Sequence, residues 1–424
     1  MREGYKKTEV GVIPEDWEVK KLEEVCNVKG GKRLPKGYQL LDEKTKNPYI
    51  RVADMYEGGI NLKNIKYVPH EAADKIKNYK ISKDDLFISV AGTLGIVGTI
   101  PPVLDDANLT ENADKLCNIK INKEFLMRVL QSTSIQNIIE AEKTSNAQPK
   151  LALSRIKEFI IPVPSREEQE KIAEILSTVD SQIDNTENLI EKSKELKKGL
   201  MQKLLTKGIG HSEFKNTEVG EIPVSWEVKK LSELTNKITD GSHSSPIPVD
   251  DSNYKICTVA NMRKNTLDIS SATNISKEDY EKLINNGCYA ENGDVLLSKD
   301  GTIGKTILYS QENEKIVLLS SIAILKPMKE KLRGEYLNQY LQDSRTLTRI
   351  VNTKTGSAIK RIVLRDINSL KIVVPKLKEQ EKIAKILLAV DNEIEEYENK
   401  KQRLEYLKKG LMQQLLTGKI RTII

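Results

Sequence analysis

The chain has 424 residues, of which 38% are hydrophobic and 30% charged, with 68 Lys and Arg against 61 Asp and Glu. This length predicts two or three globular domains, and the supply of apolar residues excludes an intrinsically disordered chain. The net charge of +7 is compatible with a polyanionic partner but does not require one.

Local features argue against several other classes of protein. The first ten residues contain no apolar segment of the kind that a secretory signal needs, so we expect a cytoplasmic protein. The uncharged stretch 86–104 contains three glycines and two prolines, and it is not expected to cross a membrane. The four cysteines form no CxxC pair and only three histidines are present, which argues against a structural zinc site.

The first distinctive segment of the chain, Thr8–Leu22, belongs to an internal duplication. It returns as Thr217–Leu231, about 210 residues later, with the two tryptophans Trp17 and Trp226 in equivalent places. Two further pairs keep nearly the same offset: Glu168–Leu176 with Glu379–Leu387, and Lys197–Gln202 with Lys408–Gln413. Because the last matched segment could continue into the first, we expect a pseudo-twofold, circular organisation whose chain ends lie close together.

Between the matched segments the two halves have diverged. Lys29–Pro35 stands opposite Ile238–Ser244, and the two segments have little in common. A shared frame that encloses different interiors suits two different ligands, or two different halves of one ligand. Short β-like runs such as 86–90 and 295–298 alternate with turn residues and helical patterns, so each half is predicted to contain an α+β domain of about 160 residues with a loop-rich face.

A long helix is predicted after each domain. Ser165 is a natural N-cap, and carboxylates follow it in the first turn. Apolar residues then recur at steps of three and four, as in a coiled coil, over about 40 residues or about 60 Å. The residues expected at the seam are Ile172, Leu176, Val179, Ile183, Leu200, Ile383, Leu387, Val390, Ile394, Leu404 and Leu411, and the same stripe includes Leu196 and Leu407.

We expect the two helices to pair with each other as an antiparallel coiled coil, with Lys192–Lys198 opposite Val390–Glu395. The alternative, two independent helices that each pack on their own domain, stays open at this point. The predicted boundaries are 1–163 for the first domain, 164–207 for the first helix, 208–374 for the second domain, and 375–424 for the second helix with the C-terminal tail.

No segment carries a complete catalytic or metal-binding pattern. Gly301–Thr306 resembles the end of a Walker A loop, but Lys299 replaces the first glycine of that motif, and the equivalent Gly92–Val97 has no lysine. We interpret the shared Gly-Thr-x-Gly as a tight turn. The proline-containing motif of DNA adenine methyltransferases and a nucleophile–histidine pattern are also missing, so we expect neither an enzyme nor a bound metal.

The positive charge lies mainly outside the predicted helices, which are almost neutral. Basic residues gather in loops of the two domains: Lys29, Lys32, Arg33 and Lys36 in the first, and Lys299, Lys305, Lys360 and Arg361 in the second. Such positions suit contacts to phosphates, with Ser, Thr, Asn and His available for base edges. A scattered, solvated surface would have a similar composition.

One set of motifs recurs in the same order in both halves. It comprises the Ile-Pro-x-x-Trp openings at Ile13–Trp17 and Ile222–Trp226, the Gly-Thr-x-Gly turns, Pro164 and Pro375, the Glu-Gln-Glu-Lys-Ile-Ala helix starts and the Lys-Lys-Gly-Leu-Met-Gln helix ends. In these motifs the chain resembles the DNA-specificity (S) subunit of type I restriction-modification enzymes, over essentially its whole length. Thr239–His243 is also similar to a turn of that family's recognition domains.

The resemblance implies a non-catalytic subunit in which 1–163 and 208–374 are target recognition domains, each reading one half of a bipartite double-stranded DNA target. The paired helices would space the half-sites and dock two methyltransferase (M) subunits. Those subunits would methylate adenine with S-adenosylmethionine, and restriction (R) subunits, joining through the complex, would add cleavage dependent on ATP and Mg. No cofactor is therefore expected in this chain itself.

Position and chemistry suggest candidate DNA-contacting residues: Lys32, Arg33, Thr93 and Lys150 in the first domain, and Ser242, His243, Lys299, Thr302, Lys305 and Arg361 in the second. Thr93 and Thr302 could equally serve only to stabilise their turns. Two rival functions stay open. One is a scaffold or decoy that binds methyltransferase subunits without reading DNA, and the other is a stand-alone DNA-binding protein.

Overall fold

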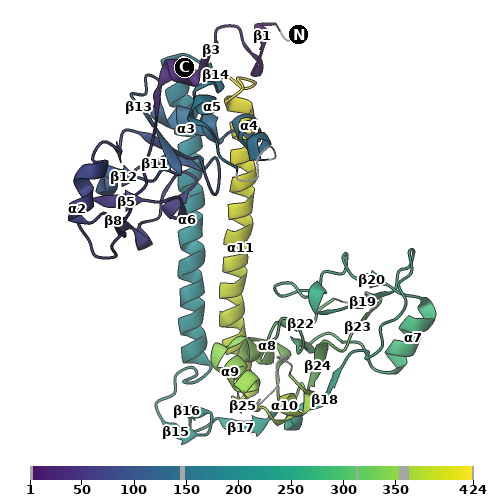
Figure 1. Cartoon of the computed structure of the whole chain (residues 1–424). Helices are drawn as coiled ribbons and strands as arrows, with labels where there is room; N and C mark the ends of the chain where they lie inside the picture. The colour runs from purple at the N-terminus through teal and green to yellow at the C-terminus, as the bar shows by residue number, and fades with distance from the viewer. Residues whose placement is uncertain (1–2, 144–148, 312–313, 353–361, 423–424) are drawn as a thin grey trace. The chain divides into compact units, whose positions relative to one another are not determined.

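The computed structural model describes residues 3–143, 149–311, 314–352 and 362–422. The chain divides into two compact units (Figure 1): the first unit comprises residues 1–187 and 399–424, and the second unit residues 188–398. Each contains a globular α+β part and portions of two long helices, α6 (Arg166–Leu204) and α11 (Leu377–Leu415). Within the described ranges, no helix combines the length and the apolar character that a membrane span needs.

The globular part of the first unit is built on a four-stranded antiparallel sheet in the order β11-β10-β13-β4, beside a smaller sheet in the order β8-β5-β12-β9. The strands of the larger sheet are β4 (Asn27–Gly30), β10 (Leu86–Ser89), β11 (Val97–Thr99) and β13 (Ala113–Cys117), and those of the smaller are β5 (Pro48–Ile50), β8 (Lys66–Tyr67), β9 (Lys80–Ile81) and β12 (Ala107–Leu109). Two-stranded pairs join β1 (Tyr5–Thr8) to β2 (Gly11–Pro14), β3 (Glu18–Lys21) to β14 (Ile160–Val163), and β6 (Met55–Tyr56) to β7 (Gly59–Ile60). The helices are α1 (Leu22–Val25), α2 (His70–Ala73), α3 (Lys123–Gln131), α4 (Thr133–Lys143) and α5 (Leu153–Lys157).

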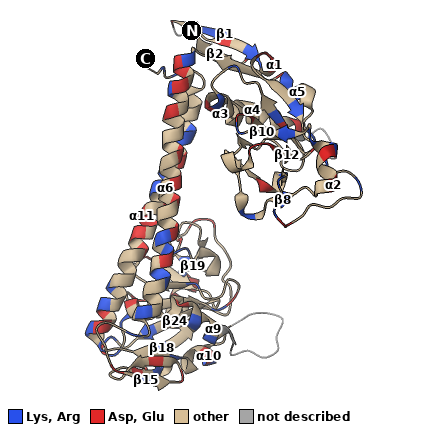
Figure 2. Cartoon of the chain, turned by 90° about the vertical axis from the view of Figure 1, so that its left-hand side faces the viewer, with Lys and Arg blue, Asp and Glu red and all other residues tan. Residues whose placement is uncertain are grey.

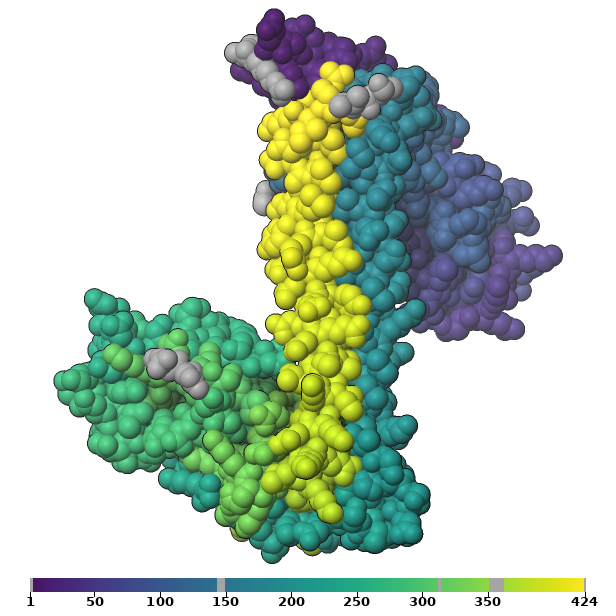
Figure 3. Space-filling view, turned by 180° about the vertical axis from the view of Figure 1, so that it is seen from behind, coloured from purple at the N-terminus to yellow at the C-terminus, as the bar shows by residue number. Residues whose placement is uncertain are grey.

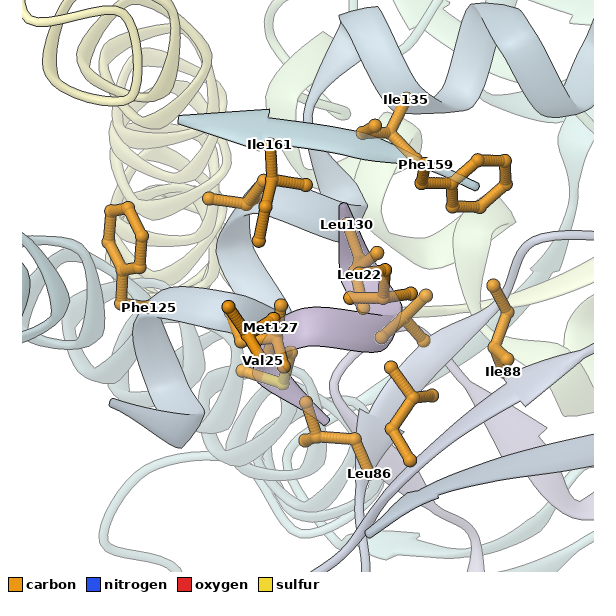
Figure 4. Packing of buried hydrophobic residues seen from close by; sticks show 14 of the residues in the cluster. Leu22, Val25, Leu86, Ile88, Phe125, Met127, Leu130, Ile135, Phe159 and Ile161 are labelled. Atoms are coloured by element: carbon orange, nitrogen blue, oxygen red, sulfur yellow. The ribbon is translucent and has the colours of Figure 1, made fainter. Parts of the chain in front are cut away.

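One hydrophobic core connects this sheet to the surrounding helices. Leu86 and Ile88 of β10 belong to the same buried cluster as Phe125 of α3 (Figure 4), and Ile172 and Leu176 of α6 belong to it as well. All five side chains are essentially inaccessible to solvent. The first turns of the long helix are therefore part of the domain core, where apolar burial contributes most to stability.

The second unit repeats this architecture. Its main antiparallel sheet has the order β18-β24-β21-β22, so that β18, β24, β21 and β22 correspond to β4, β13, β10 and β11 of the first unit. The strands of this sheet are β18 (Thr235–Asp240), β21 (Val295–Ser298), β22 (Thr306–Leu308) and β24 (Ile322–Pro327); a smaller sheet contains β19 (Lys255–Cys257), β20 (Thr273–Asn274) and β23 (Ile316–Leu318). Two-stranded pairs join β15 (Phe214–Thr217) to β16 (Gly220–Pro223) and β17 (Glu227–Lys230) to β25 (Lys371–Val374). The helices are α7 (Lys277–Asn285), α8 (Gly334–Gln342), α9 (Ser344–Asn352) and α10 (Leu364–Ser369).

The two long helices form where the sequence predicts them, and they pair in antiparallel fashion. The Ser165 hydroxyl accepts a hydrogen bond from the Glu168 backbone N–H at 3.2 Å, as expected of an N-cap. Ion pairs connect the helices within the first unit (Asp180–Lys408, 2.7 Å; Glu187–Lys401, 2.9 Å) and within the second (Lys194–Glu398, 3.8 Å; Lys197–Asp391, 2.6 Å). Partner numbers fall along one helix as they rise along the other, so the alternative of independent helices is wrong.

Each unit has one carboxylate at the junction of both long helices and a short helix of its domain. In the second unit Asp391 of α11 accepts hydrogen bonds from Lys197 of α6 at 2.6 Å and from Gln339 of α8 at 2.8 Å. In the first unit Asp180 of α6 pairs in the same way with Lys408 of α11 and with Arg128 of α3. The Lys197–Asp391 pair confirms the predicted register of Lys192–Lys198 opposite Val390–Glu395. The contact of each carboxylate with a short helix of its domain was not predicted, and it attaches the domain to the long helices.

The predicted seam residues are largely excluded from solvent. Ile172, Leu176, Val179, Ile383, Leu387, Val390 and Ile394 are buried, and Ile183, Leu200, Leu404 and Leu411 are half-buried. Leu196 and Leu407 are instead 52% and 50% exposed, which corrects their placement in the stripe. Each leucine immediately precedes a lysine, Lys197 or Lys408, that pairs with an aspartate of the opposite helix. Because successive residues of a helix point about 100° apart, the leucine points away from that helix when the lysine points toward it.

The circular organisation closes in the first unit, where the segment after α11 packs against the N-terminal part of the chain. The hydroxyl of Tyr5 donates to the carbonyl of Gly418 at 2.8 Å. Arg421 binds the buried carboxylate of Glu168, which also accepts a hydrogen bond from the indole N–H of Trp17 at 3.0 Å. The residues that close the first unit therefore come from both ends of the chain.

The equivalent place in the second unit is closed by the segment after α6. Glu379 accepts hydrogen bonds from the Trp226 indole N–H at 2.9 Å and the Ile209 backbone N–H at 3.0 Å, and the ring of His211 lies 2.8 Å from it. His211 thus occupies the position that Arg421 has in the first unit. The same Trp–Glu pair is completed by an arginine in the first repeat and by a histidine in the second.

Candidate nucleic-acid interface

The candidate DNA-contacting loops of each unit gather at one end of its main sheet. In the first unit β4 ends at Gly30, β10 ends at Ser89 and β13 begins at Ala113, and antiparallel pairing places these three residues at the same edge. In the second unit Asp240, Ser298 and Ile322 mark the same edge of β18, β21 and β24. We call this end of each sheet the loop edge.

A glycine at the loop edge allows two backbone segments to approach closely in both units. A Cβ atom on Gly31 would lie 2.0 Å from the carbonyl oxygen of Thr110, and one on Gly241 would lie 2.0 Å from that of Leu318. Only glycine fits at such a distance. The two loops therefore share their backbone path although their sequences have little in common.

The Gly-Thr-x-Gly segments form the tight turns that the sequence predicts. Gly92 and Gly95 have φ of +77° and +82°, and Gly301 and Gly304 have +68° and +91°, values that favour glycine. A buried serine hydroxyl at the end of the preceding strand anchors each turn: Ser89 accepts from the Ile96 N–H and Ser298 from the Lys305 N–H, both at 2.8 Å. Thr93 and Thr302 lie exposed on these turns.

The other predicted residues of the first unit also lie at its loop edge. Lys32 is exposed, its backbone N–H donates to the carbonyl of Leu109 at 2.8 Å, and its ammonium lies 5.5 Å from the ring centre of Tyr79. Arg33 is exposed and forms an ion pair with Glu111. Lys150 is exposed and forms a β-bridge with Ala91, two residues before Thr93. The structure thus brings these four candidates to one edge.

In the second unit the predicted residues divide into exposed and buried groups. His243, Thr302 and Lys305 are exposed. Ser242 is buried, with its hydroxyl donating to the carbonyl of Ser244 at 2.6 Å. Lys299 is only 2% exposed, because its ammonium is paired with the carboxylate of Asp240 at 3.0 Å. Lys299 therefore lies beneath the loop edge and not on its surface; Arg361 lies outside the described residues.

Asp114, a residue that sequence reasoning did not single out, is buried at the loop edge of the first unit. It pairs with Gly30 across β13 and β4, and its side chain is 5% exposed. Among the described residues, its Oδ2 atom has no hydrogen-bond partner. Burial raises the pKa of this carboxyl to about 6, while the positive charge of Lys150 acts to lower it.

The raised pKa predicts that Asp114→Asn stabilises the protein at neutral pH. Above pH 6 the folded protein holds a buried, ionised carboxylate, and a shift from 3.8 to about 6 corresponds to about 3 kcal/mol of unfolding free energy. As the pH falls through 6 towards 3.8, Asp114 binds a proton in the folded protein before it does so in the unfolded chain, and this penalty disappears. Urea unfolding should show the largest gain from Asp114→Asn at pH 8 and about half of it at pH 5.

The exposed Asp84 supplies the control, since Asp84→Asn should leave stability unchanged throughout. A gain from Asp114→Asn that is independent of pH would contradict the assignment, because it would not arise from ionisation.

Charges of both signs are mixed along the two long helices (Figure 2), as their near-neutral sequences imply. The exposed residues of the loop edges are of a different kind. Lys32, Arg33 and Lys150 in the first unit and His243 and Lys305 in the second provide cationic or hydrogen-bonding groups. Groups of this kind bind phosphates and the edges of bases.

Comparison with known proteins identifies the family. The model of the type I restriction modification DNA specificity domain matches residues 14–195 and again 223–406. The putative type I restriction enzyme MjaX specificity subunit of Methanocaldococcus jannaschii is 30% identical over 99% of this chain and 97% of its own length. The MjaVIII specificity subunit of the same organism is 28% identical over 96% of this chain and 94% of its own length.

The fold has a counterpart among solved structures. The S subunit of a type I restriction-modification system from M. genitalium has a TM-score of 0.57 to this chain at 17% sequence identity, and the similarity covers 94% of this chain and 96% of that one. The duplicated matches to the family model coincide with the duplication seen in the sequence and in the two units. The chain therefore belongs to the family of type I restriction-modification DNA specificity subunits.

Proposed function

We propose that the chain reads a bipartite, asymmetric double-stranded DNA target, with residues 1–163 and 208–374 as target recognition domains that present their loop edges to the two half-sites. One observation carries the proposal. The same backbone scaffold, built on Gly31 and Ser89 in one unit and on Gly241 and Ser298 in the other, carries different exposed side chains in the two units. Equal scaffolds with different surfaces suit different half-sites.

The first half-site is contacted in this proposal by Lys32, Arg33, Thr93 and Lys150. The second is contacted by His243, Thr302 and Lys305, with Ser242 and Lys299 supporting them from beneath. The basic residues position the duplex through phosphates, and the polar side chains read base edges in the groove. The modest net charge of +7 predicts strong dependence on partner subunits for overall affinity.

Specificity subunits of this family act within a complex and do not catalyse the reaction. Methyltransferase subunits, bound with S-adenosylmethionine, would modify adenine in the selected target, and restriction subunits would supply ATP- and Mg-dependent cleavage. We propose that two methyltransferase subunits bind, one for each repeat. The role of this chain is then to choose the sequence and to place its partners on it.

A pair of exposed leucines supports a docking position on each repeat. Leu196 on α6 and Leu407 on α11 occupy equivalent places in the duplicated sequence and are about half exposed. The long helices keep an uncovered face (Figure 3). The exposure of the two leucine side chains makes them accessible to a partner. Because the centre of a protein interface is more apolar than the rest of the surface, two equivalent exposed leucines suit two equivalent contacts.

Arginine at either leucine is expected to remove one methyltransferase subunit from the complex. A charge placed in an apolar contact costs several kcal/mol, while the exposed position tolerates it in the free chain. Native mass spectrometry after co-expression with a type I modification subunit should show two bound copies for wild type, one for Leu196→Arg or Leu407→Arg, and none for the double variant. Leu189→Arg, at an exposed position whose counterpart is Lys400, is the control and should retain two.

The same preparation separates the rival functions. A stand-alone DNA-binding protein would not co-purify with the modification subunit. A scaffold or decoy would co-purify but would give a complex without sequence-selective methylation. Retention of two subunits by both arginine variants would refute the proposed docking positions without affecting the proposal that the loop edges read DNA.

A further inference from the structure

We propose that Asp240 is a positioning residue for recognition of the second half-site, and that it acts by holding His243 in place; the proposal rests on the function proposed above. Asp114 is its counterpart at the loop edge of the first unit. The two repeats supply a largely buried carboxylate from opposite strands of the same cross-strand pair.

The two carboxylates occupy equivalent places in the two sheets. Asp114 of β13 pairs with Gly30 of β4, and Asp240 of β18 pairs with Ala323 of β24. Since β4 corresponds to β18 and β13 to β24, the acidic residue has changed strands while its place at the loop edge is retained. The residue opposite is small in both units, which leaves room for the carboxylate.

Asp240 connects the inside of the second unit to its surface. Its Oδ2 atom lies 3.0 Å from the ammonium of Lys299, whose side chain is 3% exposed, and its Oδ1 atom lies 3.2 Å from Nε2 of His243, whose side chain is 70% exposed. Lys299 follows β21 and His243 follows β18, so one carboxylate ties together two loops of the loop edge. The buried ion pair holds Asp240, and Asp240 in turn orients an imidazole that faces solvent.

The first unit has the carboxylate without the buried lysine. The position of Lys299 is taken by Val90, which is buried. Asp114 instead experiences the charge of Lys150, an exposed residue on the segment that forms a β-bridge with Ala91. In each unit the buried carboxylate is thus associated with an exposed basic or imidazole side chain, Lys150 in one and His243 in the other.

A fixed orientation is what base recognition requires of a surface side chain. A free imidazole samples several rotamers and loses that freedom on binding, whereas a side chain already held by a neighbouring acceptor loses little. Removing the acceptor should therefore weaken discrimination between bases more than overall affinity for DNA, which depends mainly on phosphate contacts.

The test uses the full chain in complex with a modification subunit and compares its affinity for the mapped target with its affinity for duplexes altered in one half-site. We expect His243→Ala to reduce discrimination at the second half-site roughly tenfold, a typical loss for one base contact. Asp240→Asn should cause a similar loss, because the single amide oxygen faces the Lys299 ammonium and the NH2 group left toward His243 cannot accept a hydrogen bond. The double variant should lose no more than either single variant, because both changes remove the same contact.

A relocation variant controls for folding. Asp240→Gly combined with Ala323→Asp reproduces the arrangement of the first unit and should restore most of the discrimination lost in Asp240→Asn. Discrimination at the first half-site should stay unchanged in all of these variants, and Asp114→Asn should alter only that half-site. Thermal unfolding of each complex shows whether the variant is folded.

Losses that add in the double variant, or unchanged discrimination in a folded Asp240→Asn complex, would overturn the proposal. Loss of folding in both Asp240→Asn and the relocation variant would also overturn it, because Asp240 would then serve stability alone. These outcomes differ from failure of the proposed function, in which the wild-type complex itself would not distinguish half-sites.

Discussion

Replacing Asp391 by alanine is expected to lower the free energy of unfolding by about 3–5 kcal/mol, the cost of leaving a buried ion without its partner. The Asp391 side chain is 5% exposed and that of Lys197 is 16% exposed, and their ion pair measures 2.6 Å. The variant would leave the Lys197 ammonium with Gln342 as its remaining acceptor and Gln339 without one for its amide. Urea unfolding of the purified chain measures the loss.

Two comparisons make this prediction specific. Lys197→Met combined with Asp391→Ala removes both charges and should recover much of the loss, since no unpaired ion remains buried. Lys194→Ala is the matched control on the same helix: its ammonium lies 3.8 Å from Glu398 and is half exposed, so the change should cost at most about 1 kcal/mol. Equal losses for Lys194→Ala and Asp391→Ala would show that the junction has no special role.

Deletion of residues 416–424 is expected to destabilise the first unit by about 5 kcal/mol or more. The deletion removes Leu416, a buried core residue worth about 2 kcal/mol, and Arg421, the cation bound to the buried carboxylate of Glu168. It also removes Gly418, which lies against Trp17. Thermal unfolding should then show a separate, earlier transition for the first unit while the second unit retains its own.

A shorter deletion that ends the chain at Thr422 keeps all three residues and should unfold like the full chain. Arg421→Ala should fall between the two deletions, because Trp17 still donates to Glu168 at 3.0 Å. An unchanged unfolding profile after the longer deletion would mean that closure of the first unit by the C-terminal segment contributes nothing to its stability.

The features that sequence reasoning predicted well are those set by local pattern and by repetition. The duplication gave equivalent domains, the apolar steps of three and four predicted both long helices, and the shared Gly-Thr-x-Gly predicted tight turns with glycines at positive φ. Pairing followed from the requirement that the two apolar stripes bury each other, and its antiparallel direction followed from the pseudo-twofold symmetry of the duplicated chain. Each of these inferences needs only contacts between residues close in sequence, or a symmetry visible in the sequence itself.

The features that were missed depend on contacts between distant polar residues. The sequence placed Asp391 in the segment opposite Lys192–Lys198, but it did not predict that a residue of the domain also binds Asp391, or that Asp180 has the same two kinds of partner. Lys299 read as a surface cation because its partner, Asp240, is about 60 residues away in the chain. Leu196 and Leu407 fit the predicted apolar stripe of the coiled coil, but both are exposed. The adjacent lysines, Lys197 and Lys408, contact the opposite helix instead.

The central claim is that this chain selects a two-part DNA sequence, and base-resolution mapping of adenine methylation tests it most directly. The chain should be co-expressed with a type I modification subunit in a host that lacks such methylation, and the host genome then mapped. The account predicts one asymmetric motif made of two short specific parts separated by a gap of fixed length. A complex that forms but methylates no recurrent motif, or a single uninterrupted one, would contradict it.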